Sequence, residues 1–357
     1  MIAEVKTTRT RPSDNIDWTT TQRVLVVKLR SIGDTVLATP SLIALRRFFP
    51  HARIDILLED WVAPLLIGFD AVDNVISVRK GAGNRLRTAF ELARTRYDVA
   101  FNLHGGTTAT FFTAASRAQH RVGYAHYQYS FLYNHLLSSA SDFWQRQQTH
   151  SAEHQLALLG YVGVPVDDRP KTRLNINAAA GADVSTACVS ARVDVDNFAL
   201  LHPSTAFHTK QWPAENFART AEYLAKQGIA SVAIAAKNET TILNDLRNAC
   251  SAPIKTFDDL TLGEITALAA QAKVFIGNDS GIAHIAAAVQ TPTVVIFGSS
   301  NRDHWRPWTD APNEIVYQEF HCQPCAGYEC KEFGEPRCIQ SVQAERVFAA
   351  IDRVLKR

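Results

Sequence analysis

Two short segments place an aspartate within two residues of a glycine, shortly after a run of mainly apolar residues. In the first, RVLVVKL leads into RSIGD, which ends at Asp34; in the second, KVFIGN leads into DSGIAH, which begins at Asp279. Continuous apolar runs of this kind are typical of strands buried in a parallel sheet. Gly33 permits a sharp turn and a close approach of a ligand. Asp34 is a candidate general base for an attacking hydroxyl, and a helix N-cap is its structural alternative.

The second segment predicts a helix that begins near Ser280. A helix N-terminus presents free backbone N–H groups and the positive end of the helix dipole, which makes it a ready site for a diphosphate. Asp279, Ser280 and Gly281 occupy this position, and His284 follows one turn later on the same face. A capping role for Asp279 and a surface or core position for His284 are the alternatives.

Two more polar residues follow apolar runs in the second half of the chain. Lys210 lies in HPSTAFHTKQWP and is a candidate to neutralise the charge of a departing diphosphate. Glu239 follows ASVAIAA and is a candidate to accept hydrogen bonds from a ribose or a sugar. The alternatives are a solvated loop lysine and a glutamate favoured by the dipole of a helix first turn.

Strand and helix patterns alternate around these residues. The strands RVLVVKL, RIDILLE, VDNVISV and YDVAFNL accompany one helix over TVLATPSLIALRRFF, with Pro40 in its first turn or at a kink, and another over 86–96. Residues 107–163 are predicted to be mostly helical or irregular. The alternation then resumes, which predicts a second α/β half. Open parallel sheets bind ligands beyond the carboxyl ends of their strands, where the candidate residues fall.

The length of 357 residues and the apolar fraction of 46% predict two packed domains. We expect a flexible tail over 1–20, a Rossmann-like domain over 21–175 and a second one over 176–357 that ends in a helix. The tail has no apolar region of a signal peptide, and no stretch reaches the roughly 18 apolar residues of a membrane span. The formal net charge of +2 argues against bulk electrostatic binding of nucleic acid.

Four of the six cysteines crowd one segment, 322–338, with the spacing C-x2-C-x4-C-x7-C. They are Cys322, Cys325, Cys330 and Cys338. Reduced, packed thiols are favoured because the tail predicts no secretion and thiols are normally kept reduced in the cytoplasm. A structural zinc ion and disulfides stay open as alternatives.

Three segments together resemble glycosyltransferase family 9, the lipopolysaccharide heptosyltransferase family. They are KLRSIGDTVLATPSLIALRRFFPHARIDILLE, HPSTAFHTKQWPAENFA and FIGNDSGIAHIAAAVQTPTVVIFGSSNRDHWRPW. The resemblance implies an α/β fold of the GT-B type, with two Rossmann-like doubly wound domains that face a cleft. The N-terminal domain would bind the acceptor and the C-terminal domain the nucleotide-sugar. No metal is implied, because GT-B enzymes use helix dipoles and basic side chains instead.

The resemblance also implies roles for single residues. It makes Asp34 the catalytic base and Lys210 the catalytic contact of the diphosphate. The residues expected to bind the donor are Ser204, Thr205, Lys210, Glu239, Asp279, Ser280, Gly281 and His284. Because the implied acceptor is acidic, we expect Gly33, Arg117 and Arg121 on the acceptor side, with solvated surface arginines as the alternative.

The implied function is inverting transfer of a heptose from ADP-heptose to the inner core of lipopolysaccharide. The ADP-sugar is a substrate, and no cofactor is expected. The expected location is the cytoplasm, with peripheral contact at the inner face of the cytoplasmic membrane. A family member that uses another nucleotide sugar and glycan, and a non-catalytic nucleotide-binding module, are the alternatives. A dinucleotide-dependent oxidoreductase is disfavoured because no G-x-G-x-x-G follows the first strand.

Overall fold

The structure, a computed structural model, describes residues 16–190, 194, 197–325 and 327–356. These residues form two compact units. The first unit holds the described residues up to Leu29, together with Pro40–Asp60 and Ala71–Pro170. The second holds Arg30–Thr39, Trp61–Asp70 and the described residues from Lys171 onward. The second unit therefore includes two segments from the first half of the sequence.

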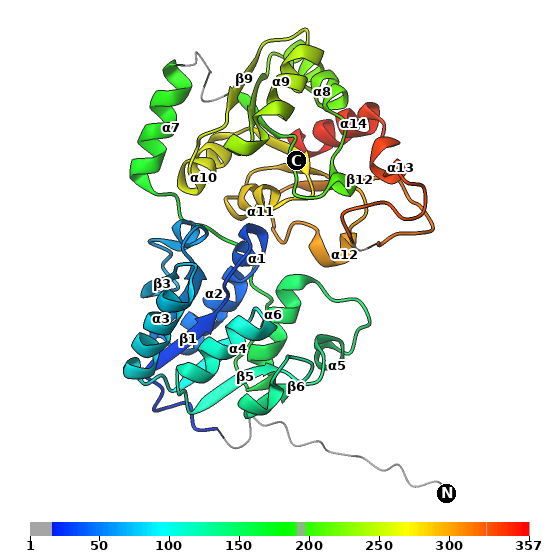
Figure 1. Cartoon of the computed structure of the whole chain (residues 1–357). Helices are drawn as coiled ribbons and strands as arrows, with labels where there is room; N and C mark the ends of the chain where they lie inside the picture. The colour runs from blue at the N-terminus through cyan, green and yellow to red at the C-terminus, as the bar shows by residue number, and fades with distance from the viewer. Residues whose placement is uncertain (1–15, 191–193, 195–196, 326, 357) are drawn as a thin grey trace, which may run out of the picture. The chain divides into compact units, whose positions relative to one another are not determined.

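A parallel sheet with strand order β3-β2-β1-β4-β5-β6 organises the first unit (Figure 1). Its strands are β1 (Arg23–Val27), β2 (Arg53–Glu59), β3 (Asn74–Val78), β4 (Val99–Asn102), β5 (His120–Tyr124) and β6 (His135–Leu137). Its helices are α2 (Thr39–Phe48), α3 (Ala82–Thr95), α4 (Gly106–Ala115), α5 (Ala140–Trp144) and α6 (Ser151–Tyr161). Helices α3 and α4 contribute Leu92 and Phe112 to one apolar core with Leu25 of β1. Burial of such side chains is the main driving force for folding.

Two details of the first half differ from the prediction. The single helix over TVLATPSLIALRRFF is instead two, α1 (Ile32–Val36) and α2, and Pro40 lies in the first turn of α2 where its missing N–H costs no hydrogen bond. Residues 107–163 do not interrupt the alternation, because they contain β5 and β6. Both strands are short, and each begins with a histidine, so the apolar pattern does not reveal them.

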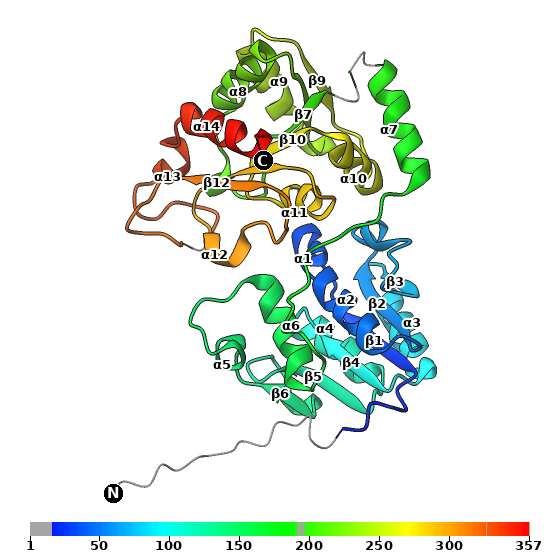
Figure 2. The same ribbon diagram turned by 180° about the vertical axis from the view of Figure 1, so that it is seen from behind.

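A second parallel sheet, with order β12-β11-β10-β7-β8-β9, organises the second unit. Its strands are β7 (Phe198–His202), β8 (Ala230–Ile234), β9 (Ile254–Phe257), β10 (Val274–Asn278), β11 (Thr293–Phe297) and β12 (Asn313–Tyr317). Its helices include α7 (Ala178–Ser190), α8 (Ala214–Lys226), α9 (Thr240–Ala249), α10 (Leu262–Gln271), α11 (Gly281–Ala288), α12 (Arg302–Trp305), α13 (Arg337–Gln340) and α14 (Ala344–Leu355). Helices α8, α9 and α14 share one apolar core with the strands (Figure 2). The predicted α/β fold with two doubly wound parallel sheets is confirmed.

The remaining parts bear on two expectations. Residues 1–15 of the expected tail lie outside the described residues, whereas Trp18 packs edge-on against Phe49 and His120 and donates a hydrogen bond of 3.0 Å to the carbonyl of Val162. Within the described ranges, no helix combines the length and apolar character that a membrane crossing requires.

Candidate functional site

Two neighbouring cavities lie at the carboxyl ends of the second sheet, and all of their lining residues belong to the second unit. The larger, of about 380 Å³, is mainly apolar. The smaller, of about 260 Å³, brings together Asp34, Lys210 and the start of α11. The residues that line both cavities are Ser31, Gly33, Thr205, Ala206, Ser280 and Gly281. One continuous site therefore has an apolar part and a charged part.

Two glycines let helix α1 approach helix α11 (Figures 1 and 2). A Cβ atom on Gly281 would lie 2.7 Å from Cβ of Ile32 and 2.9 Å from the backbone nitrogen of Gly33. A Cβ atom on Gly33 would lie 2.8 Å from Cδ2 of His284. Such distances are too short for real side chains, so both positions require glycine. This close packing is what brings the RSIGD turn to the N-terminus of α11.

Asp34 is half-buried in the first turn of α1. The N-cap of this helix is Ser31, so the capping alternative for Asp34 is wrong. The hydroxyl of Ser31 donates a hydrogen bond of 3.0 Å to the Asp34 carboxylate. This contact orients the carboxylate within the first turn of α1.

Asp279 is buried and forms an ion pair with Lys210, whose ammonium donates a hydrogen bond of 2.8 Å to the carboxylate. Ser300 donates to the same carboxylate oxygen. The N-cap of α11 is the next residue, Ser280, so the capping alternative for Asp279 is also wrong. Asp279 instead fixes the Lys210 ammonium beside the helix N-terminus.

Buried Asn278 anchors the loop that carries Lys210. Its side-chain nitrogen donates a hydrogen bond of 2.8 Å to the carbonyl of Pro203, and its side-chain oxygen accepts one of 3.1 Å from the Trp212 backbone. One residue at the end of β10 thus holds both ends of the loop.

Two buried histidines flank the start of α11. A hydrogen bond of 3.1 Å joins Nδ1 of His202 to the Ser280 hydroxyl, and burial lowers the pKa of His202 to about 4 against the opposing charge of Glu239. Burial also lowers the pKa of His284, which Asp279 and Asp34 oppose. Both imidazoles are therefore neutral near pH 7. His284 combines a core position with a place in the lining of the smaller cavity.

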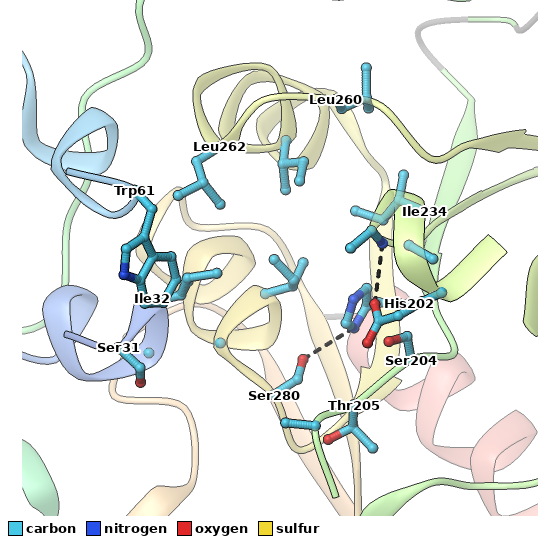
Figure 3. Close-up of a pocket in the computed structure, with 18 residues that line it drawn as sticks. Ser31, Ile32, Trp61, His202, Ser204, Thr205, Ile234, Leu260, Leu262 and Ser280 are labelled. Atoms are coloured by element: carbon cyan, nitrogen blue, oxygen red, sulfur yellow. Dashed lines mark hydrogen bonds between the residues drawn. The ribbon is translucent and has the colours of Figure 1, made fainter. Parts of the chain in front are cut away.

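The apolar cavity has walls from several loops, with Trp61 and Ile32 on one side and Ile234 on the opposite side (Figure 3). Ser204, Thr205 and Glu239, three of the residues predicted to bind the donor, also line it. The carboxylate of Glu239 accepts a hydrogen bond of 3.2 Å from the backbone of Ala236. This contact fixes the carboxylate at the end of β8.

Sequence reasoning missed Trp61 and His202 as site residues. Trp61 is the second residue after β2, which ends at Glu59, and His202 is the last residue of β7. The rule that ligands bind beyond the carboxyl ends of parallel strands points to both positions.

Arg117 and Arg121 are not brought to these cavities. They belong to the first unit, where Arg121 lies near the amino end of β5 and Arg117 precedes that strand. The guanidinium of Arg121 donates hydrogen bonds of 2.6 Å to the carbonyls of Leu132 and Ala118. In the structure this side chain joins two backbone segments.

The four clustered cysteines line one small cavity with Thr209 and Ser299, and their thiols are free. Burial raises the pKa of Cys325 and of Cys338. Among the described residues, no group of three or more His, Cys, Asp or Glu side chains is placed to hold a metal ion. The Cys325 N–H donates to the carbonyl of Ser299, so this segment supports the loops around Lys210.

The chain is similar to known proteins over most of its length. The profile of glycosyltransferase family 9 (heptosyltransferase) matches residues 85–334. The chain is 25% identical over 347 residues to lipopolysaccharide heptosyltransferase 3 of Escherichia coli, with 92% of this chain and 97% of the relative covered. It also superposes on the crystal structure of a family 9 glycosyltransferase from Veillonella parvula, with a TM-score of 0.81, 20% identity, and 94% and 97% of the two chains covered.

A second solved neighbour is ADP-heptose lps heptosyltransferase II of E. coli, with a TM-score of 0.78, 20% identity, and 94% and 99% of the two chains covered. The shared fold defines the GT-B class of glycosyltransferases. Within it, the chain belongs to glycosyltransferase family 9, the heptosyltransferase family. The family and the class of enzyme that the three sequence segments indicate are confirmed.

Proposed function

We propose that this enzyme transfers a heptose from ADP-heptose to the inner core of lipopolysaccharide with inversion at the anomeric carbon. The observation that supports it most is a charged cavity lined by Asp34, Lys210 and the N-terminus of α11, which adjoins an apolar cavity of about 380 Å³. Ligand pockets are typically about 300–1,000 Å³ and apolar, with a few placed polar groups.

The donor occupies both cavities in this proposal. The nucleoside lies in the apolar part, where Glu239 accepts hydrogen bonds from the ribose. The diphosphate lies at the start of α11, where Ser204, Thr205 and Lys210 surround it. Asp279 and His284 maintain the shape of the diphosphate region, because Asp279 fixes Lys210 and His284 packs against Gly33.

The transfer is one displacement. The acceptor oxygen forms a bond to the anomeric carbon while the bond from that carbon to the diphosphate oxygen breaks. Asp34 takes the proton of the acceptor hydroxyl, and ADP leaves with the bonding electron pair. Lys210 and the α11 dipole oppose the negative charge that grows on the diphosphate, so the proposed chemistry requires no metal cofactor.

The acceptor is proposed to be the acidic, phosphorylated core, bound by the N-terminal domain (21–175). The C-terminal domain (176–357) binds the donor. This activity places the protein in the cytoplasm, in peripheral contact with the inner face of the membrane.

A screen of nucleotide sugars with mass detection of the elongated acceptor tests the proposal. Elongation by one heptose from ADP-heptose supports it. Elongation from another nucleotide sugar alone would assign the enzyme a different donor, and binding of nucleotide without any elongation would favour a non-catalytic module.

A further inference from the structure

Helix α3 exposes two large apolar side chains on its outer face. Leu86 is 64% exposed and Phe90 is 63% exposed, and they stand one helical turn apart. The opposite face of the same helix buries Ala89 and Leu92 in the core of the first unit. The exposed pair is therefore additional to what the fold requires, because α3 already has an apolar face for its sheet.

Basic residues surround this pair. The segment 79–96 contains six basic residues and one acidic residue. The basic residues are Arg79, Lys80, Arg85, Arg87, Arg94 and Arg96. The acidic one, Glu91, accepts a hydrogen bond of 3.2 Å from Arg87. Five net positive charges thus gather in 18 residues, whereas the whole chain has a net charge of only +2.

The apolar and basic side chains form one surface, which we call the α3 surface (Leu86, Phe90 and the six basic residues). The guanidinium of Arg94 lies 5.5 Å from the centroid of the Phe90 ring. Amphipathic helices that lie on membranes combine exposed Leu or Phe with flanking Lys and Arg, because the apolar groups enter the lipid and the cations meet anionic headgroups.

We propose that the α3 surface docks on an anionic lipid bilayer. Leu86 and Phe90 enter the boundary between headgroups and acyl chains, and the basic residues contact lipid phosphates. A second copy of the chain is disfavoured as the partner, because the same face on each copy would place positive charges against positive charges. A purely anionic glycan is disfavoured as the partner because it would offer no apolar surface to contact Leu86 and Phe90. The inference deepens the membrane contact that the proposed function requires.

Flotation of the full chain with lipid vesicles, without donor or acceptor, tests this. We expect binding to phosphatidylcholine vesicles that contain phosphatidylglycerol, weak binding to phosphatidylcholine alone, and a loss of binding as salt rises. The charge variant is Arg79→Gln/Lys80→Gln/Arg85→Gln. Each cation near an anionic surface is worth about fivefold in affinity, so the triple variant should bind roughly 100-fold more weakly. A matched control removes three exposed cations of the second unit, Lys226→Gln/Arg247→Gln/Lys255→Gln, and should bind like the wild type.

The apolar variant is Leu86→Ser/Phe90→Ser, and Phe131→Ser, which removes a side chain that is 79% exposed, is its control. We expect the double variant to lose at least about tenfold in affinity and the control to lose little. Thermal melting of each variant shows whether it is folded. The proposal would be wrong if the folded α3 variants bound vesicles as well as the wild type does. It would also be wrong if the wild type bound neither kind of vesicle, or if the wild type formed a dimer through Leu86 and Phe90. Because no sugar transfer is measured, these outcomes are independent of whether the proposed heptosyl transfer is correct.

Discussion

The ammonium of Lys210 donates a hydrogen bond of 2.8 Å to the carboxylate of Asp279, directly before the N-terminus of α11. The carboxylate is buried, and the lysine side chain is 20% exposed. The pair therefore holds a cation in place before any donor binds. A charge that is already positioned needs no reorganisation when negative charge develops, which is the condition for electrostatic catalysis.

We expect Lys210→Ala to cost roughly 2 to 4 kcal/mol of transition-state stabilisation, mostly as lost turnover and partly as weaker binding of the diphosphate. Calorimetry with ADP and with adenosine, alongside a turnover assay, measures both parts. Adenosine should bind the wild type and the variant alike, because the phosphates are absent.

The control for this experiment is Lys226→Ala, which removes an exposed lysine of α8. It should leave both affinities and turnover unchanged. If Lys210→Ala weakened adenosine and ADP equally, the lysine would support the fold or the nucleoside pocket, and its role at the diphosphate would be wrong.

The contact between α1 and α11 gives a second prediction. In Gly281→Ala, the added methyl would meet Ile32 at 2.7 Å and push α1 away. Such overpacking typically costs about 1–3 kcal/mol of the free energy of unfolding, and it should also reduce turnover because Asp34 moves with α1. Urea unfolding and a turnover assay measure the two effects.

Gly181→Ala is a suitable control, because a Cβ at Gly181 meets nothing within 4 Å. Alanine there should be neutral or stabilise helix α7 by up to about 1 kcal/mol. Wild-type stability and turnover in Gly281→Ala would show that the two helices do not need this close approach.

Burial of His202 gives a prediction about pH. Its pKa is about 4 in the folded protein against an ordinary value of 6.5. Between pH 6.5 and pH 4 the unfolded chain therefore binds a proton on this histidine, whereas the folded protein does not. Stability from this residue is therefore complete above pH 6.5 and is lost towards pH 4. At pH 5 the loss should be about 2 kcal/mol of the free energy of unfolding.

Urea unfolding at neutral pH and at pH 5 measures this loss in the wild type and in His202→Asn. The loss should be smaller by about 2 kcal/mol in the variant, since asparagine does not titrate. His284 is present in both proteins, so its contribution cancels. A substitution of exposed His51 should leave the loss unchanged. The same loss in wild type and His202→Asn would contradict the assignment.

The sequence predicts those parts of the fold whose signals are local. Apolar runs mark β1, β2 and β10. Strands β5 and β6 escape prediction because their pairing depends on distant residues, and their polar starts conceal the pattern.

In the candidate site, too, the residues with local sequence signals are predicted and those that depend on tertiary packing are missed. Asp34, Lys210 and Gly281 are found from strand ends and from family resemblance, and the structure brings them to one cavity. Trp61 escapes because its role depends on a loop of the first half packing with the second unit, which no local pattern encodes. The hydrogen bonds from the Arg121 guanidinium to backbone carbonyls also cannot be predicted from the sequence, which indicates only a positive charge at this position.

The most direct test of the proposed transfer and of the role of Asp34 is the rate of acceptor elongation from saturating ADP-heptose by wild type and by Asp34→Asn. Asparagine keeps the size of the side chain and its contact with Ser31 but accepts no proton, so donor affinity measured by calorimetry should stay close to that of the wild type. We expect the acceptor to gain one heptose in the wild type, and the rate to be lower by roughly 100-fold or more in the variant. An equal rate in the two proteins would contradict Asp34 as the base, and an unchanged acceptor in the wild type would contradict the proposed transfer itself.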